Sequence, residues 1–84
     1  MNIYVGNLDY KVEENDLGDV FSEYGSISSA KVIMDKVSGR SKGFGFVEMP
    51  NDDEAKKAIQ ELDGATYEDR KITVNEAKPR KTNY

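Results

Sequence analysis

Hydrophobic and polar residues alternate in four short stretches of the chain, which is the pattern of strands that bury one face. In the first stretch, Ile3 and Val5 share one side of the strand and Tyr4 lies on the other. A glycine-asparagine pair ends this stretch, and Pro50 ends the third. We predict strands at residues 2–7, 27–35, 43–49 and 71–76.

Two other stretches carry hydrophobic residues with the i, i+3, i+4, i+7 spacing of an amphipathic helix. These residues are Leu17, Val20, Phe21 and Tyr24 in the first stretch, and Ala55, Ala58, Ile59 and Leu62 in the second. We predict one helix over residues 14–24 and another that follows Asn51 and ends at Asp63.

The ends of both predicted helices carry recognisable signals. Asn51 is a good N-cap, and Glu54 is predicted to complete a capping box with it. Gly25 and Gly64 are predicted to close the two helices in the left-handed conformation. Residues 12–13 offer no good N-cap for the first helix, although acids in its first turn favour the helix dipole.

The predicted elements follow one another in the order β-α-β-β-α-β, with a polar loop at residues 36–42 and a turn or short hairpin at residues 65–70. This order is typical of the α+β class with a ferredoxin-like sandwich, in which a four-stranded antiparallel sheet carries two helices on one face. We therefore predict a single domain over residues 1–77. Residues 78–84 are predicted to form a basic, flexible C-terminal tail.

The alternation also assigns each strand residue to the helix-covered face of the sheet or to its open face. The covered face is predicted to hold Ile3, Val5, Val32, Val47, Met49, Ile72 and Val74, together with Gly43 and Gly45. The open face is predicted to hold Tyr4, Lys31, Ile33, Phe44, Phe46, Glu48, Thr73 and Asn75. Three aromatic side chains are thus left on a face that no element covers, which indicates a binding surface. The alternative is that a partner chain, or the tail folding back, buries ordinary strand aromatics.

Residues 42–49, with the sequence KGFGFVEM, resemble the octapeptide of the RNA recognition motif. They match every defined position except the last, where Met49 replaces an aromatic residue. Residues 3–8, with the sequence IYVGNL, resemble the second, hexapeptide motif of the same family. The resemblance covers about residues 2–78, and as a short chain with one domain the protein is similar to the small bacterial and cyanobacterial RNA-binding proteins of this family.

The resemblance implies that the chain binds single-stranded RNA, whose bases stack on aromatic side chains. Tyr4 and Phe44 would each stack on a base, and Phe46 would pack against the sugars between them. Lys42 would hold a phosphate, whereas Met49 faces the core by parity and so affects packing rather than ligand contact. Single-stranded DNA is a second candidate ligand, and no cofactor is expected. The bases would be framed by Lys31, Ile33, Thr73, Asn75 and the backbone at residues 77–78.

The net charge of −4 and the pI of about 4.8 argue against a nucleic-acid partner when taken alone. The acids, however, gather on the two predicted helices and their end residues, which carry −5 and −3, so the rest of the chain carries +4. Because the acidic helices repel the RNA backbone, binding should be weaker and more salt-sensitive than that of a basic domain. We predict that basic residues around the aromatic face contact phosphates, namely Lys31, Arg40, Lys42, Lys78 and Arg80.

The composition excludes several classes of site. The chain has no cysteine and no histidine, so it has neither disulfides nor thiolate or imidazole metal ligands. No predicted cleft pairs carboxylates for acid–base chemistry, so we expect no enzymatic activity and no metal site. The sequence shows no apolar run of membrane-spanning length and no signal-peptide pattern, and we expect a cytosolic monomer that does not bind membranes.

One alternative function stays open. Some members of the family bury the aromatic face against a protein, or bind a protein through one of the helices. The chain would then be a protein-interaction module with the same fold, and its composition does not separate this hypothesis from RNA binding.

Overall fold

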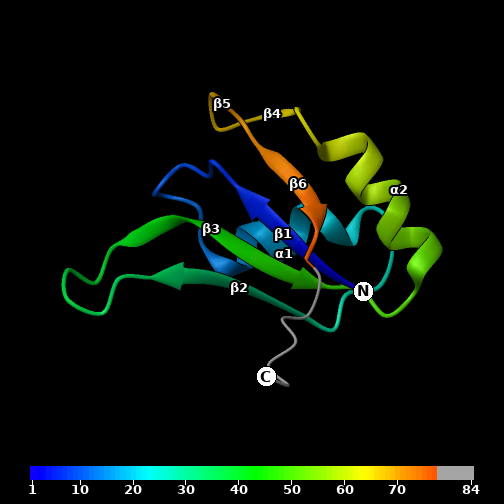
Figure 1. Ribbon diagram of the computed structural model, residues 1–84, viewed down its shortest axis with the longest axis horizontal. Coiled ribbons are helices and arrows are strands. Elements are labelled where there is room, and N and C mark those ends of the chain that lie inside the picture. The colour runs from blue at the N-terminus through cyan, green and yellow to red at the C-terminus, as the bar shows by residue number, and fades with distance from the viewer. Residues whose placement is uncertain (78–84) are drawn as a thin grey trace, which may run out of the picture.

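The alternating and helical patterns produce the predicted sandwich, as the computed structural model shows for residues 1–77. The sheet consists of β1 (Asn2–Gly6), β2 (Ser29–Met34), β3 (Ser41–Glu48) and β6 (Thr73–Glu76), all antiparallel, in the order β2-β3-β1-β6. The remaining elements are α1 (Glu14–Ser22), α2 (Asp52–Leu62) and a short hairpin of β4 (Thr66–Tyr67) and β5 (Arg70–Lys71). Figure 1 shows α1 behind the sheet and α2 beside β6 (Figure 1). The predicted tail, with Lys78 and Arg80, lies outside the described residues.

Several elements begin or end at other residues than predicted. The helix α1 ends two residues early, β2 is shorter at both ends, and β3 begins two residues early. The last predicted strand is interrupted at Ile72, whose N–H donates to the carbonyl of Ala65 at 2.9 Å. The carbonyl of Ile72 accepts from the N–H of Gly64 at 2.8 Å, so Ile72 pairs with the segment after α2. Pairing with β1 starts only at Thr73.

The helix ends confirm two of the predicted signals and show that two others are wrong. Asn51 caps α2, since its Oδ1 accepts from the N–H of Glu54 at 3.0 Å, and Gly64 follows the helix with a φ of 82°. Glu54 makes no capping box, because its carboxylate accepts from the N–H of Ser26 at 3.2 Å instead. Gly25 has a φ of 159°, which is nearly extended and not left-handed helical. A Cβ at Gly25 would collide with the Glu54 carboxylate, so the glycine makes room for that side chain.

The acids at the start of α1 have backbone partners that the sequence pattern did not reveal. The Asp16 carboxylate accepts from the N–H of Glu13 at 3.0 Å and supplies part of the missing cap. The side chain of Glu14 extends toward β2, and its Oε2 accepts a hydrogen bond from the N–H of Val32 at 3.3 Å. Because β2 is an edge strand, this N–H has no neighbouring strand to bind. The first turn of α1 is thus fixed to the edge of the sheet.

The core between the sheet and the helices is hydrophobic throughout the described part of the chain. The seven predicted strand residues are all buried, with exposed fractions of 6% or less, and Met49 is among them at 0%. Two further core residues, Leu8 and Val12, lie in the loop between β1 and α1 and were not predicted. The helices contribute Leu17, Phe21, Ala55 and Ala58 to this core.

None of the helices within residues 1–77 is long and apolar enough to span a membrane.

At Gly45, β3 lies close to both β2 and α1. A Cβ on Gly45 would collide with the backbone carbonyl of Lys31 and would lie 3.2 Å from Cδ2 of Leu17. The pairing of β2 with β3 shifts register nearby, between Val32 and Met34. Helix approach was the predicted reason for this glycine, but the backbone of the neighbouring strand is closer still.

We expect Val47→Ala to lower the free energy of unfolding by about 2 kcal/mol or more, because the change removes buried carbon and leaves a cavity. Val37→Ala is the matched control, since Val37 is 98% exposed and Val47 is fully buried at 0%. The control should stay within about 0.5 kcal/mol of the wild type. Urea unfolding measures both values, and equal losses in the two variants would contradict the assignment of the core face.

Candidate nucleic-acid interface

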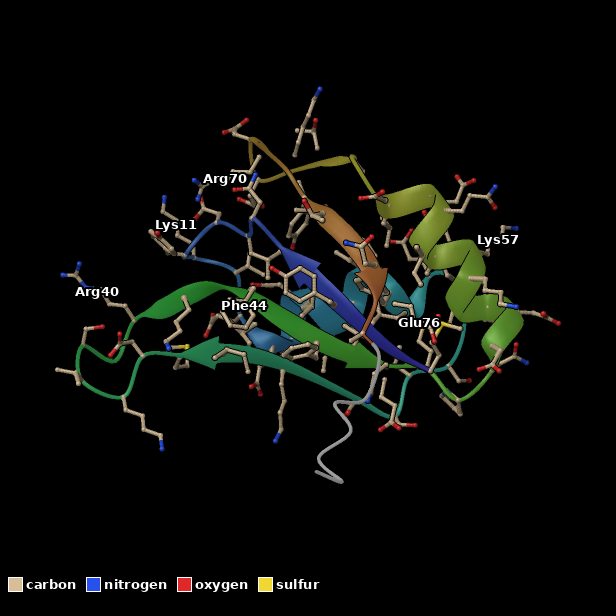
Figure 2. All side chains as sticks on the ribbon, in the orientation of Figure 1. Lys11, Arg40, Phe44, Lys57, Arg70 and Glu76 are labelled. Atoms are coloured by element: carbon tan, nitrogen blue, oxygen red, sulfur yellow. The ribbon has the colours of Figure 1, made fainter. Side chains whose placement is uncertain are left out.

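Three aromatic side chains meet on the open face of the sheet, over its two central strands. We call Tyr4 of β1 together with Phe44 and Phe46 of β3 the aromatic patch. The centroids of the three ring pairs are 5.8, 5.9 and 6.1 Å apart, at interplanar angles of 64°, 33° and 90°. Tilted and edge-to-face pairs at these distances attract each other, so each ring supports the other two. Figure 2 shows Phe44 in front of the sheet, on the side away from α1 (Figure 2).

The patch is less exposed than the alternation alone suggested, since Tyr4 and Phe44 are half-buried and only Phe46 is exposed, at 37%. Part of the reason is Gly6, which lies two residues along β1 from Tyr4 and on the same face. A Cβ on Gly6 would lie 2.5 Å from Oη of Tyr4 and 2.8 and 2.9 Å from two ring carbons. The Tyr4 ring therefore lies along β1 above Gly6, in space that a side chain at position 6 would fill.

One row of paired residues crosses all four strands of the sheet through the patch. Lys31 of β2 pairs with Phe46, Phe46 pairs with Tyr4, and Tyr4 pairs with Asn75 of β6. Directly paired residues share a face, so Lys31 and Asn75 flank the patch on its two sides. Both flanking side chains are exposed. The structure thus brings these four predicted site residues together in a single line.

The other predicted site residues within the described part of the chain lie around this row. Thr73 is exposed on β6, and Ile33 is half-buried at the register shift of β2. Lys42, near the start of β3, is exposed and borders the same shallow groove as Phe44. Arg40 lies in the loop between β2 and β3, and its side chain points away from Phe44 (Figure 2). Arg40 is therefore separate from the patch, whereas Lys42 lies beside it.

Asp35 orders the loop that carries Arg40. Its Oδ1 accepts from the N–H of Val37 at 2.7 Å and of Ser38 at 3.2 Å, and its own N–H donates to the carbonyl of Arg40 at 2.7 Å. The hydrogen bonds from Ser38 and Val37 favour the charged form, so they lower the pKa of the Asp35 carboxyl below its ordinary value of 3.8. The backbone of Arg40 is thus fixed, although its side chain is exposed.

The lysines beside the patch form no ion pair within residues 1–77, although the charge of Lys42 acts on the carboxylate of Asp35. Over that range the one ion pair joins the N-terminal amine to Asp52 at 3.7 Å. Lys31 and Lys42 can therefore bind an anion without first releasing a carboxylate. The same residues contain no group of three or more acidic, histidine or cysteine side chains that could hold a metal. Open aromatic rings with unpaired cations at their margin can hold the bases and phosphates of a single-stranded nucleic acid.

Comparison with known proteins identifies the family of the chain. The family model of the RNA recognition motif matches residues 3–73. The chain belongs to the RNA recognition motif family. RbpB of Nostoc sp. is 52% identical over 80 residues, which cover 95% of this chain and 78% of that protein. The 28 kDa chloroplastic ribonucleoprotein of Nicotiana sylvestris is 48% identical over 84 residues, which cover 98% of this chain but only 30% of the longer protein.

Solved structures of other proteins share the fold. The crystal structure of RNA binding protein PG1 matches with a TM-score of 0.92 at 50% identity, and the match covers 98% of this chain and 99% of the other. A complex of the Sxl-lethal protein with RNA matches with a TM-score of 0.89 at 26% identity, over 95% of this chain and 48% of the other. These matches confirm the predicted α+β sandwich and the predicted resemblance to the family.

Three residues beside the patch of this RNA recognition motif were not predicted from the sequence. Gly6 was interpreted only as the end of a strand, although its spacing of two from Tyr4 was a usable signal. Tyr10 lies in the loop after β1 and is 66% exposed, and Arg70 lies in the β4–β5 hairpin. No periodicity applies to loops, so only the structure shows that Tyr10 and Arg70 lie next to Phe44.

We expect Gly6→Ala to push the Tyr4 ring off β1 and to separate it from the other two rings. Gly6 does not have a positive φ, so the backbone should accept alanine. The unfolding free energy should fall by about 1 kcal/mol, because Tyr4 loses its contacts with both other rings. NMR measures the effect as a loss of cross-peaks between the Tyr4 and Phe44 rings. Unchanged cross-peaks in the variant would show that the ring does not depend on the space above Gly6.

Proposed function

We propose that the protein binds single-stranded RNA by stacking two bases on the aromatic patch. The observation that carries this proposal is the row formed by Lys31, Phe46, Tyr4 and Asn75. It places aromatic rings at the centre of a face that neither helix covers, with a cation at one margin and an amide at the other. Single strands present unpaired bases, which stack on aromatic side chains and can be read along their edges.

Each residue of the patch has a distinct role in this proposal. Tyr4 and Phe44 each stack on one base, and Phe46 packs against the sugars that join them. Lys42 near the start of β3 and Lys31 on β2 bind phosphates. The remaining residues surround the bases and contribute selectivity, and they are Ile33, Thr73, Asn75 and the backbone near residue 77.

The related proteins support RNA as the ligand. One is named a ribonucleoprotein, another is named RNA binding protein PG1, and the Sxl-lethal protein was solved together with RNA. Single-stranded DNA could stack on the same rings, so DNA of matched sequence is the proper comparison ligand. The monomeric state and the cytosolic location stay predictions from the sequence.

The acidic composition is compatible with this proposal because most acids lie on and beside the helices. Glu48, two residues from Phe46 on β3, is an acid that shares the open face with the patch. The segment of α1 with its flanking residues 13 and 23 carries five acids and no basic residue. Arg40 points away from the patch, so it would contact only RNA that continues past the β2–β3 loop. Contacts from Lys78 and Arg80 stay predictions, since both lie outside the described residues. We expect weak, salt-sensitive binding overall.

We expect Phe44→Ala to weaken RNA binding by about 1–3 kcal/mol, the usual loss for one stacked base. The unfolding free energy should also fall by about 1 kcal/mol, because Phe44 contacts the rings of both Tyr4 and Phe46. Titration of tyrosine fluorescence with a short single-stranded RNA measures the affinity.

Phe44→Tyr is the matched control for this experiment, since it keeps the ring and should bind nearly as well as the wild type. If Phe44→Ala also binds like the wild type, the patch does not stack on RNA. The alternative function, a face or helix that binds a protein partner, would then be favoured.

We expect log affinity to fall with log salt at a slope of roughly −1.4 to −2.8, which corresponds to about two to four neutralised phosphates on a single strand. Lys42→Gln should make this slope shallower by about 0.7. Lys57→Gln removes the same charge from α2 (Figure 2) and should leave the slope unchanged. Phe44→Ala should lower affinity at every salt concentration without altering the slope. A slope that changes with Phe44 and not with Lys42 would contradict the assigned roles.

A further inference from the structure

A shallow groove continues from the aromatic patch toward the loop after β1 and the β4–β5 hairpin. It has a volume of about 220 Å³, and the rings of Tyr4 and Phe44 form part of its wall. Tyr10, Lys42 and Arg70 also line it, and none of these three was part of the stacking row. The volume is below that of ordinary small-molecule pockets, so the groove fits one unit of a longer chain better than a free ligand.

Tyr10 is held outward by a tight turn. The N–H of Val12 donates to the carbonyl of Asp9 at 3.0 Å, and the N–H of Lys11 donates to Oδ1 of Asp9 at 2.8 Å. Tyr10 occupies a central position of this turn and remains 66% exposed, so its ring contributes little to the core. A Cβ on Gly43 would lie 3.3 Å from a carbon of the Tyr10 ring, and the glycine thus leaves space for the ring beside β3.

Arg70 is positioned over the same ring. Its Cζ lies 5.8 Å from the centroid of Tyr10, within the range of a cation–π contact, and Nη1 donates to the carbonyl of Leu8 at 3.5 Å. Within residues 1–77 no carboxylate pairs with Arg70 or with Lys42. No acidic side chain lines the groove, so it presents two unpaired cations and an exposed aromatic ring together.

We infer that this groove binds a further nucleotide of the same RNA, next to the bases on the aromatic patch. The base lies against the Tyr10 ring, and a phosphate lies between Lys42 and Arg70. This inference rests on the proposed function, because the groove is open and shares Tyr4 and Phe44 with the patch. Arg70 and Phe44 line the same groove, so one strand can reach both.

The test is a series of oligonucleotides of two to six residues, titrated by NMR. The probe is whichever of oligoadenylate, oligocytidylate and oligouridylate the wild type binds most tightly. Tyr10→Leu should change dinucleotide binding less than twofold, because a dinucleotide fills the patch alone. The same variant should weaken binding of the longer oligonucleotides by roughly fivefold to 150-fold, the range for loss of one stacked base.

Arg70→Gln provides an independent variant with a charge-matched control. It should weaken binding of the longer oligonucleotides and make their salt slope shallower by about 0.7. Lys71→Gln removes the same charge one residue away, outside the groove, and should change neither value. Equal effects of Arg70→Gln and Lys71→Gln would contradict nucleotide binding in the groove, because the effect would then come from net charge alone.

Two further outcomes separate this inference from the proposed function. If Phe44→Ala weakens binding but Tyr10→Leu binds every length like the wild type, the groove does not bind a nucleotide. The proposed stacking on the aromatic patch would still hold. If the wild type binds none of the three oligonucleotides, or Phe44→Ala has no effect, the proposed function fails and the inference fails with it. Melting temperatures confirm that each variant is folded.

Discussion

Two helices can cover only one face of a four-stranded sheet, and the rest of this structure depends on that constraint. The covered face forms one hydrophobic core, in which every described buried side chain is apolar. The other face must remain in water unless a ligand or partner covers it. Aromatic rings on that face cannot be explained by folding, since the core on the other side is complete without them. Their mutual contacts reduce the cost of exposure and hold their relative positions.

The strand residues could be predicted because alternation is a local property of the chain. Val47 and Phe46 are neighbours in sequence, and parity alone assigns one to the core and the other to the open face. The octapeptide and hexapeptide motifs also indicate the family from the sequence alone. The prediction that Gly25 closes the first helix in the left-handed conformation was wrong. That glycine instead makes room for the carboxylate of Glu54, a residue far away in the sequence.

The groove beside the patch could not be predicted, because its residues come from three separate segments of the chain. Tyr10 lies in a turn, Arg70 in a hairpin and Lys42 at the beginning of a strand. Their approach depends on a hydrogen-bonded turn at Asp9 and on a positive φ at Gly43, and neither gives a periodic signal. The row through Lys31 and Asn75 was predictable only as a set of residues on one face. Its register required the pairing of the strands.

The hydrogen bond from the N–H of Val32 to Glu14 has a consequence for solubility. An edge strand offers unpaired backbone groups to any other strand, and this is a common route to aggregation. In β2 one of these donors, the N–H of Val32, already donates to the carboxylate of Glu14. It lies next to the register shift that also bends the strand. A second copy of the chain could pair with the middle of β2 only by displacing a charged side chain anchored on α1. The protein can therefore keep aromatic rings in water on its open face while the neighbouring edge resists strand addition.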